Sequence, residues 1–188
     1  FIHNSDNIYT AKCLARSSVE IVKSNSKGYA RVRAVDSQLR YNGIVREDLC
    51  GAFLKLDRTK YTPITQHNLC YADTCIVIKN QPRREIFSLA ILGFLFNFLP
   101  KEIKKKKALI VGTAYGYSIH ILKKMGYTVY GVEHDKVLLK LSLETLKAIE
   151  PTICCDELSN GFEEYAPYDL ILIEAGVEEV PKKIFAQL

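Results

Sequence analysis

Two glycines and a glutamate mark the part of this 188-residue chain that is best suited to chemistry. In the stretch ALIVGTAYGYS, residues 108–118, an apolar run meets Gly112 and Gly116, as when a buried parallel strand breaks into a tight turn and opens a helix. Glycine lets backbone amides approach a bound group, and the free N–H groups of a helix start favour electron-rich atoms. About twenty residues on, Glu133 ends the next apolar strand, where a carboxylate holds ribose hydroxyls in nucleotide-binding βαβ units. These residues predict a nucleoside pocket.

The same pattern occurs in α/β domains of unrelated function, so other interpretations stay open. The glycines also fit a purely structural role, in which they let strand and helix pack closely while Glu133 caps a strand or the next helix. A nicotinamide-binding domain shares the order of strand, turn and acid. The rest of the chain must decide between these readings.

Composition indicates a globular protein with one ordinary domain, because 48% of the residues are hydrophobic and 25% are charged. The net charge of +5 comes partly from the run Lys104–Lys107, which fits a solvated loop, and no aromatic residues interleave with basic ones as in a nucleic-acid surface. The longest apolar run, Ile86–Leu99, is too short to span a bilayer and predicts a core helix that stops at Pro100. We therefore expect neither nucleic acid nor membrane as a partner.

The six cysteines form no CxxC pair and have no matching histidine spacing. No signal peptide precedes them, so the interpretation is free thiols in a reducing cytoplasm. Cys154 and Cys155 are adjacent and would point in opposite directions on a strand, which disfavours a zinc site. We expect no metal.

Apolar periodicity and turn residues predict a regular alternation of strands and helices after residue 100, the pattern of a doubly wound α/β sheet. Asp57–Asn80 is predicted to be a long polar connection of the kind that often forms a binding loop or lid. Three parts are expected: residues 1–28 as a leader or loosely attached arm, 29–100 as a helical, substrate-side segment, and 101–188 as a Rossmann-like core that forms one domain with 29–100. The predicted helices are Thr10–Val22, Tyr29–Tyr41, Arg46–Leu56, Arg83–Leu99, Tyr115–Met125 and Lys136–Ile149, and the predicted strands are Lys107–Val111, Thr128–Val132, Thr152–Cys155 and Asp169–Ile173.

Four segments in order resemble the protein-L-isoaspartate O-methyltransferase family. They are VDSQLRYNGIVREDLCGAF from Val35, LDRTKYTP from Leu56, LCYADTCIVI from Leu69 and YDLILIEAGVEEVPKKIFAQL from Tyr168. The resemblance implies the class I methyltransferase fold, S-adenosylmethionine as cofactor, and methylation of L-isoaspartyl carboxylates in damaged protein or peptide substrates. An ionised carboxylate needs no general base, so catalysis is expected to be mostly positioning.

The resemblance also implies roles for single residues. Asp156, or its neighbour Glu157, is placed where the family reads adenine, and Asn80 faces the substrate. His134 lies beside the predicted pocket, and a solvent-facing or structural role is favoured for it over a chemical one. The cofactor-binding set implied in this way is Gly112, Thr113, Ala114, Gly116, Tyr117, Glu133, His134 and Asp156.

The chain departs from the family pattern at several points. Ile78 and Asn80 stand at the threonine and serine positions of the substrate-contacting stretch, and Ile110 and Ala114 replace an acid and a glycine around the first strand, which predicts weakened cofactor affinity. The family continues beyond Leu188 with further strands, so we expect either that this chain is a fragment or that a partner, such as a second copy, covers the sheet edge. These departures favour two alternatives, a methyltransferase-fold binding protein without turnover and a methyltransferase of a different substrate.

Overall fold

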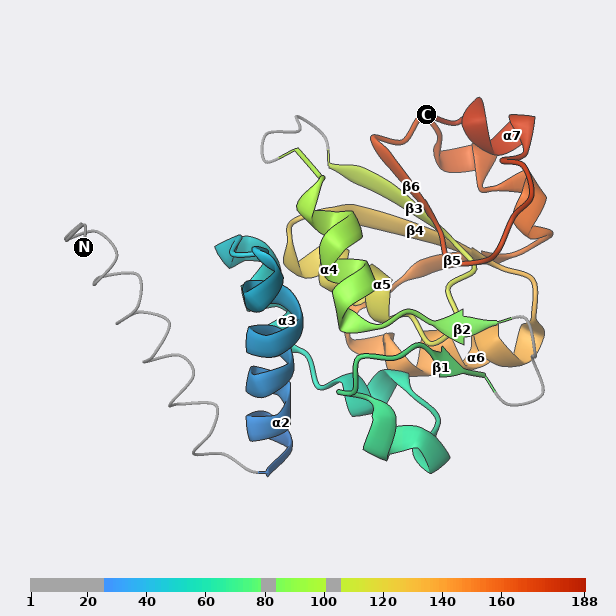
Figure 1. Cartoon of the computed structure of the whole chain (residues 1–188). Coiled ribbons are helices and arrows are strands. Elements are labelled where there is room, and N and C mark those ends of the chain that lie inside the picture. The colour runs from blue at the N-terminus through green and yellow to red at the C-terminus, as the bar shows by residue number, and fades with distance from the viewer. Residues whose placement is uncertain (1–25, 79–83, 101–105) are drawn as a thin grey trace.

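The computed structural model describes residues 26–78, 84–100 and 106–188 (Figure 1). The predicted helix Thr10–Val22 and the predicted substrate residue Asn80 lie outside these residues.

Four parallel strands form the central sheet. Their spatial order is β5-β4-β3-β6, so the first strand of the sheet, β3, lies in the middle, and β6 pairs only with β3 among the residues described. This order confirms the predicted Rossmann-like parallel sheet. The strands are β3 (Lys107–Val111), β4 (Thr128–Glu133), β5 (Thr152–Cys155) and β6 (Leu170–Ile173).

Both faces of the sheet are covered, which explains the uninterrupted apolar run of β3. Ala108 and Ile110 join a large core with the helices, whereas Leu109 and Val111 join a second core with Tyr168 and other aromatic residues of the last third of the chain. Successive side chains of a strand point to opposite faces, so a strand buried on both sides needs apolar residues at every position.

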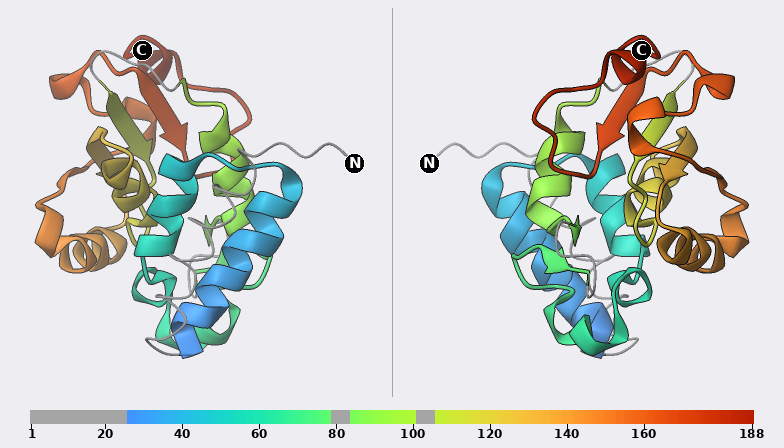
Figure 2. Two further views of the ribbon diagram at one scale, coloured as in Figure 1. Left: turned by 90° about the vertical axis from the view of Figure 1, so that its left-hand side faces the viewer. Right: turned by 90° about the vertical axis from the view of Figure 1, so that its right-hand side faces the viewer.

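The N-terminal segment forms a helical layer beside the sheet. Figures 1 and 2 show α2 (Ser26–Ala34), α3 (Glu47–Lys55) and α4 (Leu89–Asn97) gathered on one side. After α2 the chain continues through a wider helical turn and one 3-10 turn, and Gly43 with φ of +79° ends it. The buried core of this layer is continuous with that of the sheet, which favours the predicted single domain for 29–188.

The helix predicted from Arg83 begins six residues later than expected. Ile76–Val77 (β1) and Glu85–Ile86 (β2) pair as a small antiparallel hairpin, and the Ser88 side chain accepts a hydrogen bond from the Ile91 N–H to start α4. α4 contributes to the core as predicted, through Leu89, Leu92 and Phe96. Its other face is exposed, since Phe94 on α4 and Phe98 directly after it are 59% and 70% exposed. No helix within the described part of the chain is long and apolar enough to cross a membrane.

The helices of the sheet region are close to those predicted. α5 (Tyr117–Lys124) begins two residues late because Gly116, with φ of +80°, precedes its first turn. α6 (Lys136–Thr145) gives way to a separate 3-10 turn at Lys147–Ile149, where one long helix was predicted. The Asp135 side chain caps α6 by accepting from two backbone N–H groups, and α7 (Lys182–Phe185) follows β6.

Candidate functional site

The predicted turn between β3 and α5 exists and has the backbone of a ligand loop. Gly112, Ala114 and Gly116 all have positive φ angles, of +86°, +46° and +80°. The Gly112 N–H donates to the Val132 carbonyl over 2.9 Å, which fixes the turn to the neighbouring strand β4. Glycine adopts such angles without strain, but Ala114 does not, so this residue holds a costly conformation at the centre of the loop.

Gly112 borders a narrow space at the carboxyl end of the sheet. A Cβ atom added there would lie 3.3 Å from Nη2 of Arg84 and 3.4 Å from the carbonyl oxygen of Glu174. Open α/β sheets bind ligands at this edge, where strand order reverses. Only a residue without a side chain leaves the space free.

Glu133 faces this turn, as predicted, and is fully buried. Its Oε2 accepts a hydrogen bond of 2.9 Å from the Ala114 N–H, and its Oε1 accepts one of 3.2 Å from the Asp135 N–H. The strand end β4 therefore delivers a carboxylate into contact with the β3–α5 loop.

Arg84, a residue that the sequence reasoning missed, holds the same carboxylate. Its Nη1 and Nη2 donate to Oε1 and Oε2 of Glu133 over 2.9 and 2.8 Å, a bidentate ion pair between side chains that are 13% and 0% exposed. Burial opposes the charge of Arg84, but the hydrogen bonds and the charge of Glu133 outweigh it and raise the pKa of Arg84. The guanidinium thus lies where a ribose would meet Glu133.

A second buried carboxyl group lies at the end of β6. Glu174 is 6% exposed and accepts a hydrogen bond from the Ser118 hydroxyl on α5. Burial raises the pKa of Glu174 to about 7, although Ser118, Arg84 and Arg58 act in the opposite direction. Near neutral pH this group is therefore balanced between its neutral and charged forms.

Replacing Glu174 by Gln is expected to change how stability depends on pH. Because the folded pKa lies above that of the unfolded chain, the native state binds the extra proton, and its contribution is complete below about pH 4.5 and lost as pH rises through about 7. Relative to Glu174→Gln, the wild-type chain should lose on the order of 2–3 kcal/mol of unfolding free energy over this window. Urea unfolding at pH 5 and pH 8 measures the difference, with the exposed Glu144→Gln on α6 as control. Parallel pH profiles for wild type and Glu174→Gln would contradict it.

Arg58 is a further buried cation that the sequence did not reveal. It is 0% exposed, Nη2 donates to the Phe87 carbonyl, and the guanidinium lies 5.0 Å from the centre of the Tyr117 ring. Its Nε and Nη1 have no hydrogen-bond partner within the part of the chain that the structure describes, and burial lowers the pKa of Arg58. The Tyr117 side chain itself packs between Tyr61 and Phe53 in the helical layer. Tyr117 was predicted to bind the cofactor. Its ring lies in the helical layer, and only its backbone, at the start of α5, lies beside the turn.

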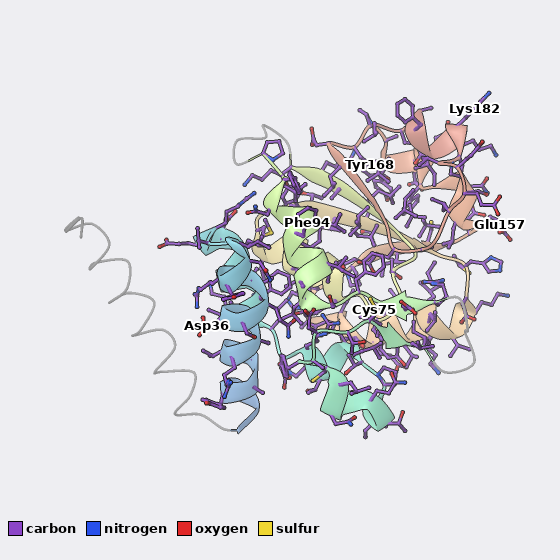
Figure 3. All side chains as sticks on the ribbon, viewed as in Figure 1. Asp36, Cys75, Phe94, Glu157, Tyr168 and Lys182 are labelled. Atoms are coloured by element: carbon purple, nitrogen blue, oxygen red, sulfur yellow. The ribbon has the colours of Figure 1, made fainter. Side chains whose placement is uncertain are left out.

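His134 and Asp156, both predicted to bind the cofactor, lie at the carboxyl ends of β4 and β5 and are exposed. The Nδ1 atom of His134 is 3.2 Å from Oε1 of Glu157, at the rim of the molecule where Figure 3 labels Glu157. Asp156 accepts hydrogen bonds from the Glu157 N–H and from Nδ2 of Asn160. They share the sheet edge with Glu133, while Asn80 falls outside the described residues.

The residues around the turn include apolar side chains and a buried hydroxyl. Ala114 packs with Ile78 and Leu138 in a small buried cluster, whereas Ile110 is fully buried in the main core. The Oγ1 atom of Thr113 is buried and has no hydrogen-bond partner among the described residues. A buried orphan hydroxyl, a space that a Cβ would fill and a strand-end carboxylate suit a nucleoside with polar hydroxyls and an apolar face. Residues 26–78, 84–100 and 106–188 hold no cluster of His, Cys, Asp and Glu suited to a metal ion.

Solved structures match this arrangement. One, a protein-L-isoaspartate O-methyltransferase, aligns with a TM-score of 0.71 and 19% identity over 84% of this chain, which spans about half of that structure's length, 52%. A second, from Plasmodium falciparum and described as a putative protein-L-isoaspartate O-methyltransferase in complex with S-adenosyl-L-homocysteine, aligns with a TM-score of 0.69 and 22% identity, covering 83% of this chain and 78% of that one. The fold is the Rossmann-like fold of the class I methyltransferases.

Sequence comparison specifies the class further. Residues 30–188 match the family model "Protein-L-isoaspartate(D-aspartate) O-methyltransferase (PCMT)". The protein-L-isoaspartate O-methyltransferase of Geobacter metallireducens is 30% identical over 163 residues, 85% of this chain and 74% of the relative, and that of Chlorobium phaeobacteroides is 30% identical over 80% and 69%. The chain belongs to the protein-L-isoaspartate O-methyltransferase family, which confirms the predicted resemblance.

Proposed function

We propose that this chain transfers a methyl group from S-adenosylmethionine to the free carboxylate of L-isoaspartyl residues in damaged proteins. The observation that carries the proposal is the contact of Glu133 with the glycine turn, in a chain that matches the family over residues 30–188. The relatives carry this activity in their names, and one structural neighbour is described in complex with S-adenosyl-L-homocysteine.

The cofactor fits the residues at the crevice. Glu133 holds the ribose hydroxyls, the backbone from Gly112 to Tyr117 lies along the amino-acid end, and Asp156 reads the adenine from the end of β5. His134 stays a candidate neighbour of the adenosine at the rim. When bound, S-adenosylmethionine supplies an electrophilic methyl group on a sulfonium.

The reaction requires little general acid–base catalysis from the protein. A carboxylate is ionised at neutral pH, so the chain has only to align it with the sulfur–methyl bond and keep water away. Arg84, whose Nη2 would lie 3.3 Å from a Cβ atom added at Gly112, places a guanidinium beside the turn, which supports an anionic acceptor. Asn80, which lies between β1 and β2 in the sequence, is proposed to position the acceptor.

The alternative of a binding protein without turnover rests on the departures at Ile78, Asn80, Ile110 and Ala114. None of them removes the loop, the strand-end carboxylate or the crevice. A different methyl acceptor is the more serious alternative, because acceptor choice depends on the loop around Asn80.

The test is methyl incorporation from labelled S-adenosylmethionine into an isoaspartyl peptide and its normal aspartyl twin. We expect incorporation into the isoaspartyl peptide and at least about tenfold less into the twin, since the two differ in the position of one carboxylate. Equal labelling of the peptides, or labelling of neither while S-adenosylhomocysteine still binds, would refute the proposed substrate.

We further propose a cytoplasmic protein that acts without nucleic acid. Within the described residues, Cys50, Cys75, Cys154 and Cys155 are not joined in disulfides, which supports a reducing compartment. Among the described residues β6 pairs with β3 alone, which supports the idea that a partner or second copy covers its other side. Light scattering across a concentration series tests self-association.

A further inference from the structure

The carboxylate that is proposed to bind the ribose is already fully engaged. Glu133 accepts two hydrogen bonds from backbone N–H groups and two from the guanidinium of Arg84, so both of its oxygens have two donors. A carboxylate has about four acceptor positions. Ribose hydroxyls can therefore bind Glu133 only if they displace either the backbone N–H groups or the Arg84 guanidinium.

Arg84 is the donor that can leave. The two N–H groups belong to the loop and to the start of α6, whose backbone is fixed by the turn and by the Asp135 cap. Arg84 instead reaches Glu133 with a long side chain from β1–β2, and its own carbonyl is held by the Ile78 N–H over 3.0 Å. The guanidinium can swing while the hairpin stays in place.

A released Arg84 needs a new anion. The side chain is 13% exposed, its Nε is buried with no partner among the described residues, and buried Ile78 and Ile86 lie in the same hairpin. An unpaired guanidinium in such surroundings carries a large desolvation cost, and its planar fork matches a carboxylate. The Nη2 atom lies over Gly112, where the amino-acid end of the cofactor and the acceptor are expected to meet.

We propose that ribose binding displaces Arg84 from Glu133 and that the freed guanidinium then binds a carboxylate of the ligand, so that Arg84 links nucleoside binding to carboxylate recognition. This inference rests on the proposed function. The carboxylate comes either from the amino-acid end of the cofactor or from the isoaspartyl acceptor, and the experiment separates the two sources.

The experiment compares wild type with Arg84→Met, which keeps the length of the side chain but removes its charge. Calorimetric titration uses three ligands: adenosine, S-adenosylhomocysteine and the decarboxylated form of S-adenosylhomocysteine. Arg84→Met should bind adenosine about tenfold more tightly, because the hydroxyls no longer displace an ion pair. A merely structural role for Arg84 would not tighten binding. Arg33→Met, the same change at an exposed position of α2, is the matched control.

Two ratios of affinities, each for a ligand with and without its carboxylate, identify the source of the carboxylate. If the cofactor supplies it, wild type prefers S-adenosylhomocysteine to its decarboxylated form by about tenfold, and Arg84→Met loses this preference. If the acceptor supplies the carboxylate, Arg84→Met keeps the same ratio of affinities for S-adenosylhomocysteine and its decarboxylated form as wild type. The second ratio then changes: with S-adenosylhomocysteine bound, wild type binds an isoaspartyl peptide more tightly than the corresponding carboxamide peptide, and Arg84→Met loses this preference. Arg84→Lys should restore part of whichever preference is lost.

Adenosine affinity that is unchanged or weaker in Arg84→Met would overturn the displacement. Carboxylate preferences that do not depend on Arg84 would overturn its second role and point instead to Glu174 as the new partner of the guanidinium. A wild-type chain that is folded by circular dichroism but binds neither adenosine nor S-adenosylhomocysteine would overturn the proposed function together with this inference.

Discussion

Replacing Glu133 by Gln is expected to weaken S-adenosylhomocysteine binding by about 30- to 100-fold. The amide has nearly the same shape but no charge, and hydrogen bonds to an ionised acceptor contribute about 1.5–3 kcal/mol. Glu133 is 0% exposed, so water does not substitute for the lost interaction as it would at the surface. Calorimetric titration of the folded variant measures the change.

The control for this prediction is Glu144→Gln, the same substitution at a side chain that is 61% exposed on α6. It should leave the affinity unchanged. Thermal melts of both variants show whether Glu133→Gln also weakens the fold, because Arg84 loses its counterion there. An affinity within threefold of wild type would show that Glu133 does not hold the nucleoside.

Gly112→Val is expected to have the larger effect, with a loss of more than about 100-fold in nucleoside affinity. The added side chain would begin 3.3 Å from Nη2 of Arg84 and 3.4 Å from the Glu174 carbonyl, and so would fill the crevice. Gly112 also has φ of +86°, an angle at which a β-branched residue is strained by about 1–2 kcal/mol.

Gly126→Val separates strain from occlusion. Gly126 has nearly the same angle, φ of +88°, but nothing lies within 4 Å of an added Cβ. Both variants should therefore lose unfolding free energy through the same backbone strain, with a further loss in Gly112→Val from its close contacts, while only Gly112→Val loses S-adenosylhomocysteine binding. Equal affinity in the two variants would place the nucleoside elsewhere.

The strands of the sheet were predictable because each is an apolar run closed by polar residues. β3 and β5 begin and end where the sequence placed them, and the other two strands differ by one residue. The hairpin β1–β2 was not predictable, since strands of two residues show no periodicity, and its second strand was absorbed into the helix predicted from Arg83. Ser88, a strong N-cap residue within that apolar run, was the sequence feature that marks the true start.

The sequence predicted those parts of the site that lie at the ends of consecutive strands. Gly112 and Glu133 follow consecutive strands, and parallel pairing of β3 with β4 brings such residues to one edge. Arg84 lies 49 positions from its partner Glu133, and no local pattern joins them. Two arginines in succession after Pro82, in a segment facing a predicted buried acid, were the available hint. The raised pKa of Glu174 depends on burial by several elements, which spacing along the chain does not report.

Tyr117 connects the turn after β3 to the helical layer. It is the first residue of α5, directly after the nucleoside turn, yet its ring is wedged among Phe53, Arg58 and Tyr61 of the helical layer. Any ligand that stiffens the turn must therefore damp motion in the segment around Arg58 as well. Amide hydrogen exchange there should slow when nucleoside is added, although that segment supplies none of the residues proposed to hold it.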